Sequence, residues 1–476
     1  MSDILSWALS GLLAAVFVAA NIVNLSWFLS KRKEGEQRAS PVLVVGGIAG
    51  ALALVIAPHQ TLEYYFWVPL VIDLGTGPYF ALSAFFTVYE GLRSGAWLKH
   101  IPFVRYLAKP GLQPPREPFP KEHAIVGCML GTAVGDAMGL ASEGLSPQRQ
   151  LRMFPKLTGY HLIINKGLTS DDTEHTCMLA QSLIETGNYH ADLIEREFLS
   201  NFAWRLRFWL LGLPAGIGLA TLRAILKLWL GFPGRHSGVF SAGNGPAMRV
   251  ALLGVCYGED MQKMRMLARA ATRITHTDPK AEYGALAVAL AAHLAATHER
   301  DVAPAEYGQV LQSLIGDEAR EFIALIRSMT ESVERGEQSA QFAAHIGCAN
   351  GVSGYICHTV PAALHVWLSH QGDYRRAVTA MVRLGGDTDT AAAIVGAITG
   401  ARVGKAGIPP EWLDNLWEWP RTAGWLEQLG IKLAERCADG YVSGGVPVSL
   451  FKLMLRNVLF IVVVLLHGFR RLLPPY

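Results

Sequence analysis

Residues 383–396 read Arg-Leu-Gly-Gly-Asp-Thr-Asp-Thr-Ala-Ala-Ala-Ile-Val-Gly, a glycine pair, two carboxylates with interleaved hydroxyls, and then an apolar run. A glycine pair allows a sharp backbone entry that a Cβ would block. Acidic and hydroxyl side chains favour the N-terminus of a helix, where they cap free N–H groups and meet the positive end of the helix dipole. Alone, the stretch predicts a capped helix. With a second acidic cluster facing it, the same stretch would form half of a metal site.

The composition indicates a membrane-attached globular body. Of the 476 residues, 51% are hydrophobic and only 17% are charged, and the length suggests one large domain with an addition. The net charge of +3 gives no reason to expect a nucleic-acid partner. The six cysteines are scattered without a C-x-x-C spacing, which indicates thiols in a reducing compartment rather than disulfides or a zinc site.

Residues 1–108 are predicted to be a membrane anchor. Three apolar segments, 4–29, 41–57 and 66–89, approach or exceed the length of about 20 residues that a spanning helix needs. The third contains Asp73, which is costly in a bilayer unless it is paired. A cleaved signal peptide is disfavoured because the only charge before the first run is that of Asp3. The distribution of Lys and Arg places the chain after residue 90 in the cytoplasm, as a multi-pass membrane protein with a cytoplasmic catalytic domain.

A proline-rich linker at 109–120 leads to a body at 121–441 whose apolar residues recur at helical spacing. We expect an all-α fold, a single large orthogonal helical domain. The apolar stretch 206–232 favours a buried helical hairpin over a membrane-surface face. The tail at 442–476 contains an uncharged run that is short for a span and is flanked by basic residues, which predicts an interfacial helix. These flanking residues are Lys452, Arg456, Arg470 and Arg471.

A second acidic cluster lies 216 positions before the first (387 minus 171), at Thr-Ser-Asp-Asp-Thr-Glu-His-Thr, residues 169–176, again before an apolar helix. A capping box between Asp171 and Glu174 would explain it locally. If the two clusters face each other, four carboxylates converge, which requires a cation or large pKa shifts. Carboxylate and hydroxyl oxygens suit Mg²⁺ or Mn²⁺, and the charge suits two ions.

A third segment carries glycines at 127, 131 and 135, four apart on one face of an expected helix, where they would allow close helix contact. Asp136 follows them directly, and Glu143 lies just beyond the helix end. These two carboxylates are further candidates for the site.

Together these motifs resemble the signatures of the ADP-ribosylglycohydrolase family, which includes dinitrogenase reductase-activating glycohydrolase. The matching segments are Gly-Asp-Ala-x-Gly at 135–139, Ser-Asp-Asp-Thr at 170–173, Gly-Gly-Asp-Thr-Asp-Thr at 385–390, Gly-Asn-Gly at 243–245, Thr-His-Thr at 275–277 and Ser-Gly-Tyr at 353–355. The resemblance covers roughly residues 121–430. It implies a helical fold with a binuclear Mg²⁺ or Mn²⁺ centre that binds ADP-ribose.

The resemblance also implies residue roles. The implied metal ligands are Ser170 (where Thr is commoner), Asp171, Asp172, Asp387, Asp389 and Thr390. The implied catalytic carboxylates, among which the resemblance does not choose, are Glu143, Asp171 and Asp172. The implied substrate contacts are Asp136, Gly243, Asn244, Gly245, His276 and Tyr355.

The expected function is metal-dependent hydrolysis of the N- or O-glycosidic bond to ADP-ribose, most directly on ADP-ribosylated proteins at the cytoplasmic face of the lipid bilayer. Two alternatives stay open. One is hydrolysis of a small ADP-ribose derivative, and the other is a protein that binds ADP-ribose without turnover.

Overall fold

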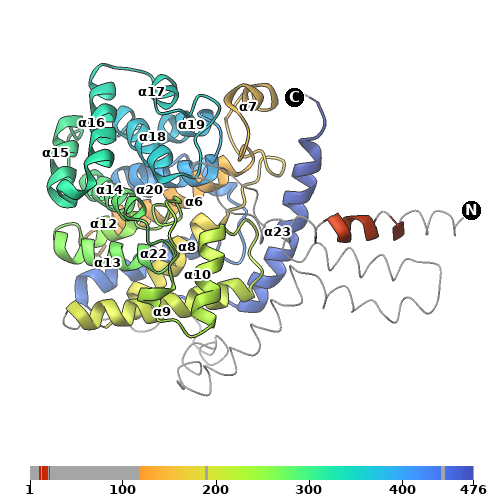
Figure 1. Ribbon diagram of the computed structural model, residues 1–476, viewed down its shortest axis with the longest axis horizontal. Coiled ribbons are helices and arrows are strands. Elements are labelled where there is room, and N and C mark those ends of the chain that lie inside the picture. The colour runs from red at the N-terminus through yellow and green to blue at the C-terminus, as the bar shows by residue number, and fades with distance from the viewer. Residues whose placement is uncertain are drawn as a thin grey trace, which may run out of the picture.

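The computed structural model describes residues 10–11, 13–19, 21, 117–187, 191–440 and 445–474 (Figure 1). In this part of the chain the regular structure is helical, and β-pairing is confined to isolated bridges, so the all-α prediction for the body is confirmed. The helices are α6 (Glu122–Leu140), α7 (Pro147–Met153), α8 (Asp171–Glu185), α9 (Ala191–Leu211), α10 (Leu219–Trp229), α11 (Gly234–Ser237), α12 (Ala251–Tyr257), α13 (Met261–Arg273), α14 (Pro279–Thr297), α15 (Pro304–Ile315), η3 (Asp317–Ala319), α16 (Arg320–Glu334), α17 (Ser339–His345), α18 (Ile356–Ser369), α19 (Tyr374–Arg383), α20 (Thr388–Gly407), α21 (Pro410–Asp414), α22 (Ala423–Asp439) and α23 (Leu450–Arg470).

The predicted membrane segments 41–57 and 66–89 lie outside the described residues, as do residues 109–116 of the linker. Of segment 4–29, residues 10–11, 13–19 and 21 are described, and they are helical. The anchor and its orientation therefore stay predictions.

Helices α6 and α20 form the centre of the domain and run antiparallel in very close contact (Figure 1). A Cβ at Gly131 would lie 2.2 Å from the carbonyl oxygen of Gly396, and one at Gly139 would lie 2.2 Å from that of Thr388. The glycine face predicted on α6 is thus the contact face, and side chains would not fit there. Because the helices are antiparallel, the C-terminal turn of α6 meets the N-terminal turn of α20.

The Gly385–Gly386 turn carries the chain into α20 with positive φ at both residues, 69° and 81°, as the sequence predicted. It is held from both sides. Gly386 N donates to Leu145 O (2.8 Å), and Val352 N donates to Gly385 O (3.0 Å). The turn therefore ties the loop that follows α6 to the start of α20.

The apolar stretch 206–232 forms the α9–α10 hairpin, and its large side chains are buried. Trp209, Leu210 and Trp229 are each at most 5% exposed. The buried-hairpin interpretation is confirmed for these residues, although Leu230 and Phe232, just beyond α10, are exposed.

Within the described residues, two helices are long and apolar enough to cross a membrane by length and composition, α6 and α23. They differ in burial. The apolar window of α6 is 94% buried in the domain, whereas that of α23 is 17% buried. Helix α6 is therefore a core helix, and α23 lies along one side of the domain with most of its apolar surface exposed (Figure 1).

One of the basic residues that flank the apolar run of α23, Arg456, faces the domain. It is 6% exposed and forms an ion pair with Glu418 of the domain, with 2.6 Å between Nη2 and Oε2. The apolar run alone gives no signal that this one arginine faces inward. The interfacial role of the helix stays a prediction.

Candidate metal and active site

The start of α8 is held by local hydrogen bonds and by Asp136. Ser170 is the N-cap, and its Oγ accepts from Asp172 N (3.3 Å) while it lies 2.9 Å from Asp172 Oδ2 as a donor. The carboxylate of Asp136, on α6, accepts from the backbone N of Ser170 (2.9 Å) and from Thr173 Oγ1 (2.5 Å). The capping box expected between Asp171 and Glu174 does not form, because Ser170 caps the helix and Glu174 pairs elsewhere.

The start of α20 is built differently. Asp387 occupies the N-cap position but makes no side-chain cap hydrogen bond, so the capping role expected for it is wrong. Its Oδ2 instead accepts from Asn244 Nδ2 (2.7 Å). Thr390 Oγ1 donates to Asp172 Oδ2 (3.2 Å), which joins the two helix starts directly.

Three carboxylates from three helices converge where these elements meet. One oxygen from each of Asp136, Asp172 and Asp389 lies within 4.8 Å of the others, and all three side chains are buried. Asp172 Oδ1 and Asp389 Oδ1 have no hydrogen-bond partner. Buried polar atoms are normally satisfied, and converging carboxylates need positive charge. The donor set is all oxygen, so these residues fit a hard cation such as Mg²⁺ or Mn²⁺.

The electrostatics of the cluster agree with a missing positive charge. Burial raises the pKa of Asp136 to about 6, although hydrogen bonds from Thr173 and Ser170 act to lower it. Burial and then the charge of Asp136 raise the pKa of Asp172, and burial and then the charge of Glu143 raise that of Asp389. The cluster therefore takes up protons in place of a cation when no metal is present.

Glu143 lies at the edge of this cluster, on the loop that follows α6. The residue is exposed, yet the surrounding protein and the charge of Asp387 raise its pKa to about 7. It is thus a carboxyl group that can hold or release a proton near neutral pH.

The sequence-predicted ligands divide into two groups. Asp172 and Asp389 belong to the three-carboxylate cluster, together with Asp136, which the sequence analysis assigned to substrate. The remaining predicted ligands lie at the same two helix starts. Of these, Ser170 and Thr390 hydrogen-bond to Asp172, while Asp171 and Asp387 are half-buried carboxylates outside the cluster.

Apart from Asp136, the predicted substrate contacts lie together beside Asp387. Gly243 and Tyr355 form an isolated antiparallel bridge, and Asn244 N donates to Gly354 O (3.0 Å). The ring of His276 lies against two of the glycines, since a Cβ would be 3.0 Å from its Nε2 at Gly243 and 3.2 Å from its Cε1 at Gly245. A cavity of about 900 Å³ adjoins this group. Its lining includes Phe240, Lys280, Tyr283, Arg320, Glu321 and Tyr355.

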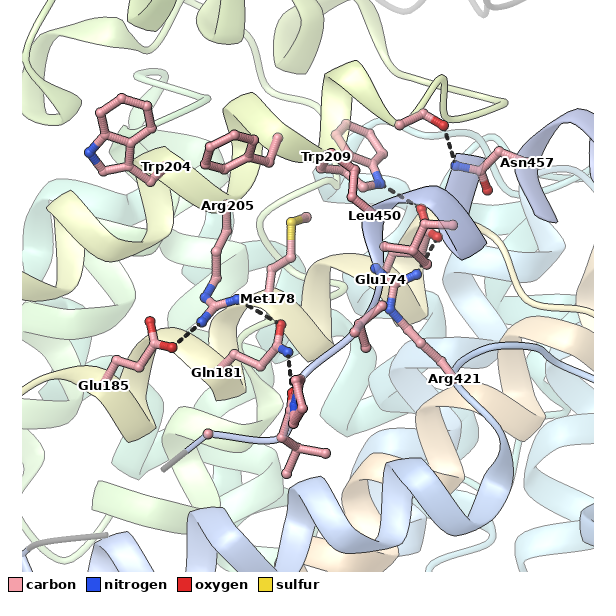
Figure 2. A pocket seen from close by; sticks show the side chains of 17 residues that line it. Glu174, Met178, Gln181, Glu185, Trp204, Arg205, Trp209, Arg421, Leu450 and Asn457 are labelled. Carbon is pink, nitrogen blue, oxygen red and sulfur yellow. Dashed lines mark hydrogen bonds and ion pairs between the residues drawn. The ribbon is translucent and has the colours of Figure 1, made fainter. Parts of the chain in front are cut away.

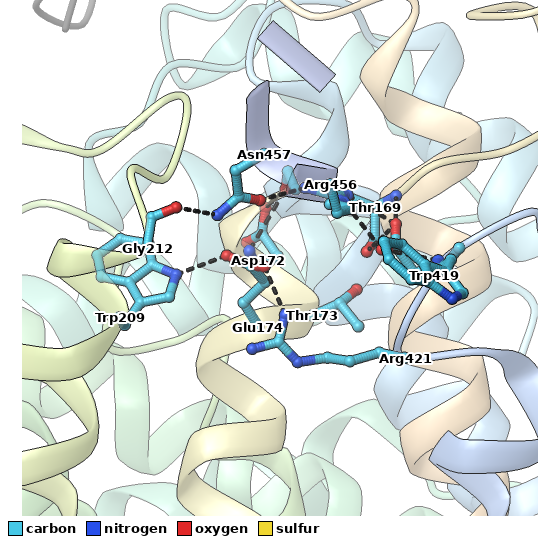
Figure 3. A network of polar contacts seen from close by, with 12 residues as sticks. Thr169, Asp172, Thr173, Glu174, Trp209, Gly212, Trp419, Arg421, Arg456 and Asn457 are labelled. Atoms are coloured by element: carbon cyan, nitrogen blue, oxygen red, sulfur yellow. Dashed lines mark hydrogen bonds and ion pairs between the residues drawn. The ribbon is translucent and has the colours of Figure 1, made fainter. Parts of the chain in front are cut away.

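Two buried Glu–Arg pairs, neither of them predicted from the sequence, support the 169–174 segment (Figure 3). Glu174 pairs with Arg421 (2.5 Å) and accepts from Trp209 Nε1 (2.5 Å). Although burial acts to raise it, the charges of Arg421 and Arg456 hold the pKa of Glu174 below its usual value. Glu418 accepts from the backbone N and Oγ1 of Thr169 (both 3.0 Å). Both partners lie far along the chain, so spacing could not reveal them.

Comparison with known proteins agrees with this geometry. The family model described as ADP-ribosylglycohydrolase matches residues 119–442. An uncharacterized protein of Archaeoglobus fulgidus is 32% identical over 319 residues, covering 66% of this chain and 97% of that protein.

Two relatives with named activities are more distant. The ADP-ribosylhydrolase ARH3 of Gallus gallus is 25% identical and covers 60% of this chain and 87% of its own length. The ADP-ribosyl-[dinitrogen reductase] glycohydrolase of Rhodospirillum rubrum is 28% identical, and the alignment covers 61% of this chain and 89% of that protein. Since the family model matches well over half of its residues, the chain belongs to the ADP-ribosylglycohydrolase family of glycosyl-bond hydrolases.

Proposed function

We propose that this protein is a metal-dependent hydrolase that cleaves the N- or O-glycosidic bond to ADP-ribose, acting on ADP-ribosylated proteins. The observation that carries the proposal is the convergence of Asp136, Asp172 and Asp389, with two buried carboxylate oxygens left without partners. A protein that only binds ADP-ribose has no need for such a cluster. The names of the relatives support the substrate class.

Two Mg²⁺ or Mn²⁺ ions would be held by Asp136, Asp172 and Asp389, with Ser170, Asp171, Asp387 and Thr390 as further ligands. Such ions supply Lewis acidity and lower the pKa of bound water. The chain itself supplies the proton-transferring carboxyl. Glu143 has a pKa raised to about 7 and lies near Asp387. Desolvation, the first cause of this shift in the metal-free chain, acts on Glu143 whether or not metal is bound, and the raised pKa suits a carboxyl group that takes a proton from water. Asp171 and Asp172 stay alternatives for this role.

ADP-ribose would occupy the space from the carboxylate cluster past Asn244 to the adjoining cavity. Asn244 is fixed by Asp387, and Tyr355 borders both regions. Tyr355 offers a half-buried aromatic face for a base, and Lys280 and Arg320 offer positive charge for a diphosphate. The cavity of about 900 Å³ is within the usual range for a ligand of this size.

The test uses the full chain in detergent or nanodiscs with Mg²⁺. It is incubated with peptides that carry ADP-ribose on Arg, on Ser or on Asp/Glu, and with O-acetyl-ADP-ribose. Release of free ADP-ribose from one peptide class, abolished by EDTA, is the expected result. Release from O-acetyl-ADP-ribose alone would favour the small-molecule alternative. Binding without release from any substrate would contradict hydrolysis.

We also propose that the domain works at the cytoplasmic face of a lipid bilayer. The outer face of α23 supports this, because it exposes large apolar side chains over its whole length, including Phe451 (76%), Leu459 (57%) and Phe469 (66%). Basic residues at its C-terminal end suit anionic lipid headgroups.

Lipid contact is testable with a photoactivatable lipid in nanodiscs that contain the full chain. We expect cross-links to peptides from 451–469. Ile164 is the control, since it is 91% exposed and lies on the domain surface, and its peptide should stay unlabelled. Equal labelling of both peptides, or labelling of neither, would contradict a lipid-facing α23.

A further inference from the structure

Helix α23 lies beyond the end of the matched family region at residue 442, yet it contacts the loops that carry the candidate site. Three of its residues are buried, Arg456, Asn457 and Phe460, and the first two make polar contacts with the domain. A buried charged side chain is stable only when it is paired and hydrogen-bonded. Because the partners of Arg456 belong to the domain, α23 is anchored in the domain and does more than rest on its surface.

The Arg456 guanidinium is fully engaged (Figure 3). Its Nε and Nη2 donate to the two oxygens of Glu418 (2.9 and 2.6 Å), a bidentate ion pair. Nη2 also donates to the backbone carbonyl of Thr169 (2.5 Å), and Nη1 donates to Asn457 Oδ1 (3.1 Å). The guanidinium is packed over the Phe460 ring, 4.2 Å from its centroid. A planar fork of this kind is specific to arginine.

Arg456 and Glu418 together hold Thr169 by three of its backbone and side-chain atoms. Glu418 binds the N and Oγ1 of Thr169, and Arg456 binds its carbonyl oxygen. The next residue is Ser170, which donates its backbone N to Asp136 and its Oγ to Asp172. Two of the three clustered carboxylates, those of Asp136 and Asp172, are thus linked to Arg456 through two consecutive residues, Thr169 and Ser170.

The other end of α23 contacts the Glu143 loop. His467 Nε2 lies 2.9 Å from Ala141 O, and the Arg149 guanidinium donates to the carbonyl oxygen of Arg471. A Cβ at Gly144 would lie 3.8 Å from Arg471 Nη2. One helix therefore bridges both loops that flank the cluster.

The contact of α23 with the domain is local rather than continuous. Near its N-terminal end, Leu450, Leu453 and Asn457 line a cavity of about 150 Å³. Trp204 and Trp209 of α9 line the same cavity (Figure 2). Where apolar packing is incomplete, Arg456 and Asn457 fix the helix through hydrogen bonds. Asn457 Nδ2 donates to Gly212 O (2.7 Å).

We propose that Arg456 is a positioning residue for the metal site, and that α23 is needed to hold the Thr169–Asp172 segment in a metal-binding geometry. This inference rests on the proposed metal-dependent function. It makes the C-terminal helix part of the active-site architecture of this chain, in addition to any contact it makes with lipid. Residues that orient metal ligands typically change metal affinity by about 10–100-fold when they are removed.

The test measures Mn²⁺ affinity by titration calorimetry and, separately, kcat and KM for ADP-ribose release, with the full chain. Arg456→Met should weaken Mn²⁺ binding about tenfold or more and lower kcat at subsaturating metal. Arg207→Met is the matched control. Arg207 is also a buried arginine, but it donates two hydrogen bonds to Leu228 O on the α9–α10 hairpin and none that is described reaches the Thr169–Asp172 segment, so Mn²⁺ affinity should stay unchanged.

A second variant separates positioning from folding. Arg456→Met/Glu418→Gln removes the unpaired buried carboxylate, so it should recover thermal stability relative to Arg456→Met, yet keep the weakened Mn²⁺ affinity. Wild-type Mn²⁺ affinity in Arg456→Met, or recovery of both properties in the double variant, would overturn the inference. If the unaltered chain binds Mn²⁺ but releases no ADP-ribose, the proposed hydrolysis fails while the metal affinities still decide the role of Arg456.

Discussion

The helix starts of α8 and α20 look alike in sequence but are held in different ways. The α8 start is fixed by a side-chain cap from Ser170 and by the Asp136 carboxylate, which accepts hydrogen bonds from the helix entry. The α20 start has no side-chain cap and depends on the Gly385–Gly386 turn and on Asn244. The α8 start has a side-chain cap of its own as well as partners from distant parts of the chain, whereas the α20 start is held without such a cap. The two nevertheless present one unpartnered carboxylate oxygen each, on Asp172 and Asp389.

If the starts of α8 and α20 serve one site, removing a carboxylate from either of them should reduce activity by the same factor. Asp172→Asn and Asp389→Asn should each reduce Mg²⁺-dependent ADP-ribose release about 10³-fold, since several kcal/mol of metal stabilisation are lost at about 1.4 kcal/mol per factor of ten. Both variants should stay folded by circular dichroism. Asp373→Asn, at the exposed N-cap of α19, is the control and should keep full activity. A large effect at only one of the two helix starts would break the comparison.

The pH dependence of stability in the metal-free protein tests whether the carboxylates at the starts of α8 and α20 repel one another. The folded-state pKa of Asp136 is raised, to about 6 from 3.8, so the metal-free protein binds this proton more tightly when folded. Proton binding to Asp136 therefore adds about 3 kcal/mol to the free energy of unfolding below pH 4. This contribution is lost as the pH rises through 6. Calorimetry without metal should show Tm falling between pH 5 and 7.5, and Mg²⁺ should remove the fall. A metal-free Tm that rises over this interval would contradict the account.

Close packing of α6 against α20 should matter more for the α20 start than for the α8 start. In Gly139→Ala the new Cβ would lie 2.2 Å from Thr388 O, which forces the helices apart and should destabilise the domain by about 2 kcal/mol. Chemical denaturation measures this change. Gly159→Ala is the matched control, because nothing lies within 4 Å of its Cβ position. Equal stability of the two variants would show that the contact is looser than described.

The smallest expected effects separate the two ways of holding a helix start. Ser170→Ala should lower the free energy of unfolding by about 1 kcal/mol through loss of the cap. Asn244→Ala should lower that stability less, because the Gly385–Gly386 turn still holds the start of α20 and Asp387 is only half-buried. It should reduce ADP-ribose release about tenfold, because Asp387 loses its donor. The Ser170→Thr variant keeps the hydroxyl and should behave as the unaltered chain does. If Asn244→Ala is less stable than Ser170→Ala, the side-chain cap of α8 contributes less to stability than the Asn244 contact at α20, which contradicts the comparison.

Much of the domain could be predicted from sequence because its signals are local. Helical periodicity predicted the all-α body, glycines four apart predicted the face of α6 that contacts α20, and the acidic motifs led to two of the three clustered carboxylates. Asp136 was found as a candidate, but its place in the cluster depends on how α6 meets α8 and α20. That relation exists only in three dimensions.

What the sequence could not provide is the set of long-range partners. The capping role expected of Asp387 failed because Asn244, 143 positions away, takes its carboxylate. The burial of Arg456 was not predicted, because its partner Glu418 lies 38 positions away in the domain. A buried ion pair carries no periodic pattern, so neither partner predicts the other.

The central claim is that Asp136, Asp172 and Asp389 bind a divalent cation. Crystals grown with Mn²⁺ and measured at an anomalous wavelength test it most directly. We predict an anomalous peak at about 2 Å from oxygens of these three carboxylates, and its loss in Asp389→Asn. A map with no peak between α6, α8 and α20 at saturating Mn²⁺ would contradict the metal site and the proposed mechanism with it.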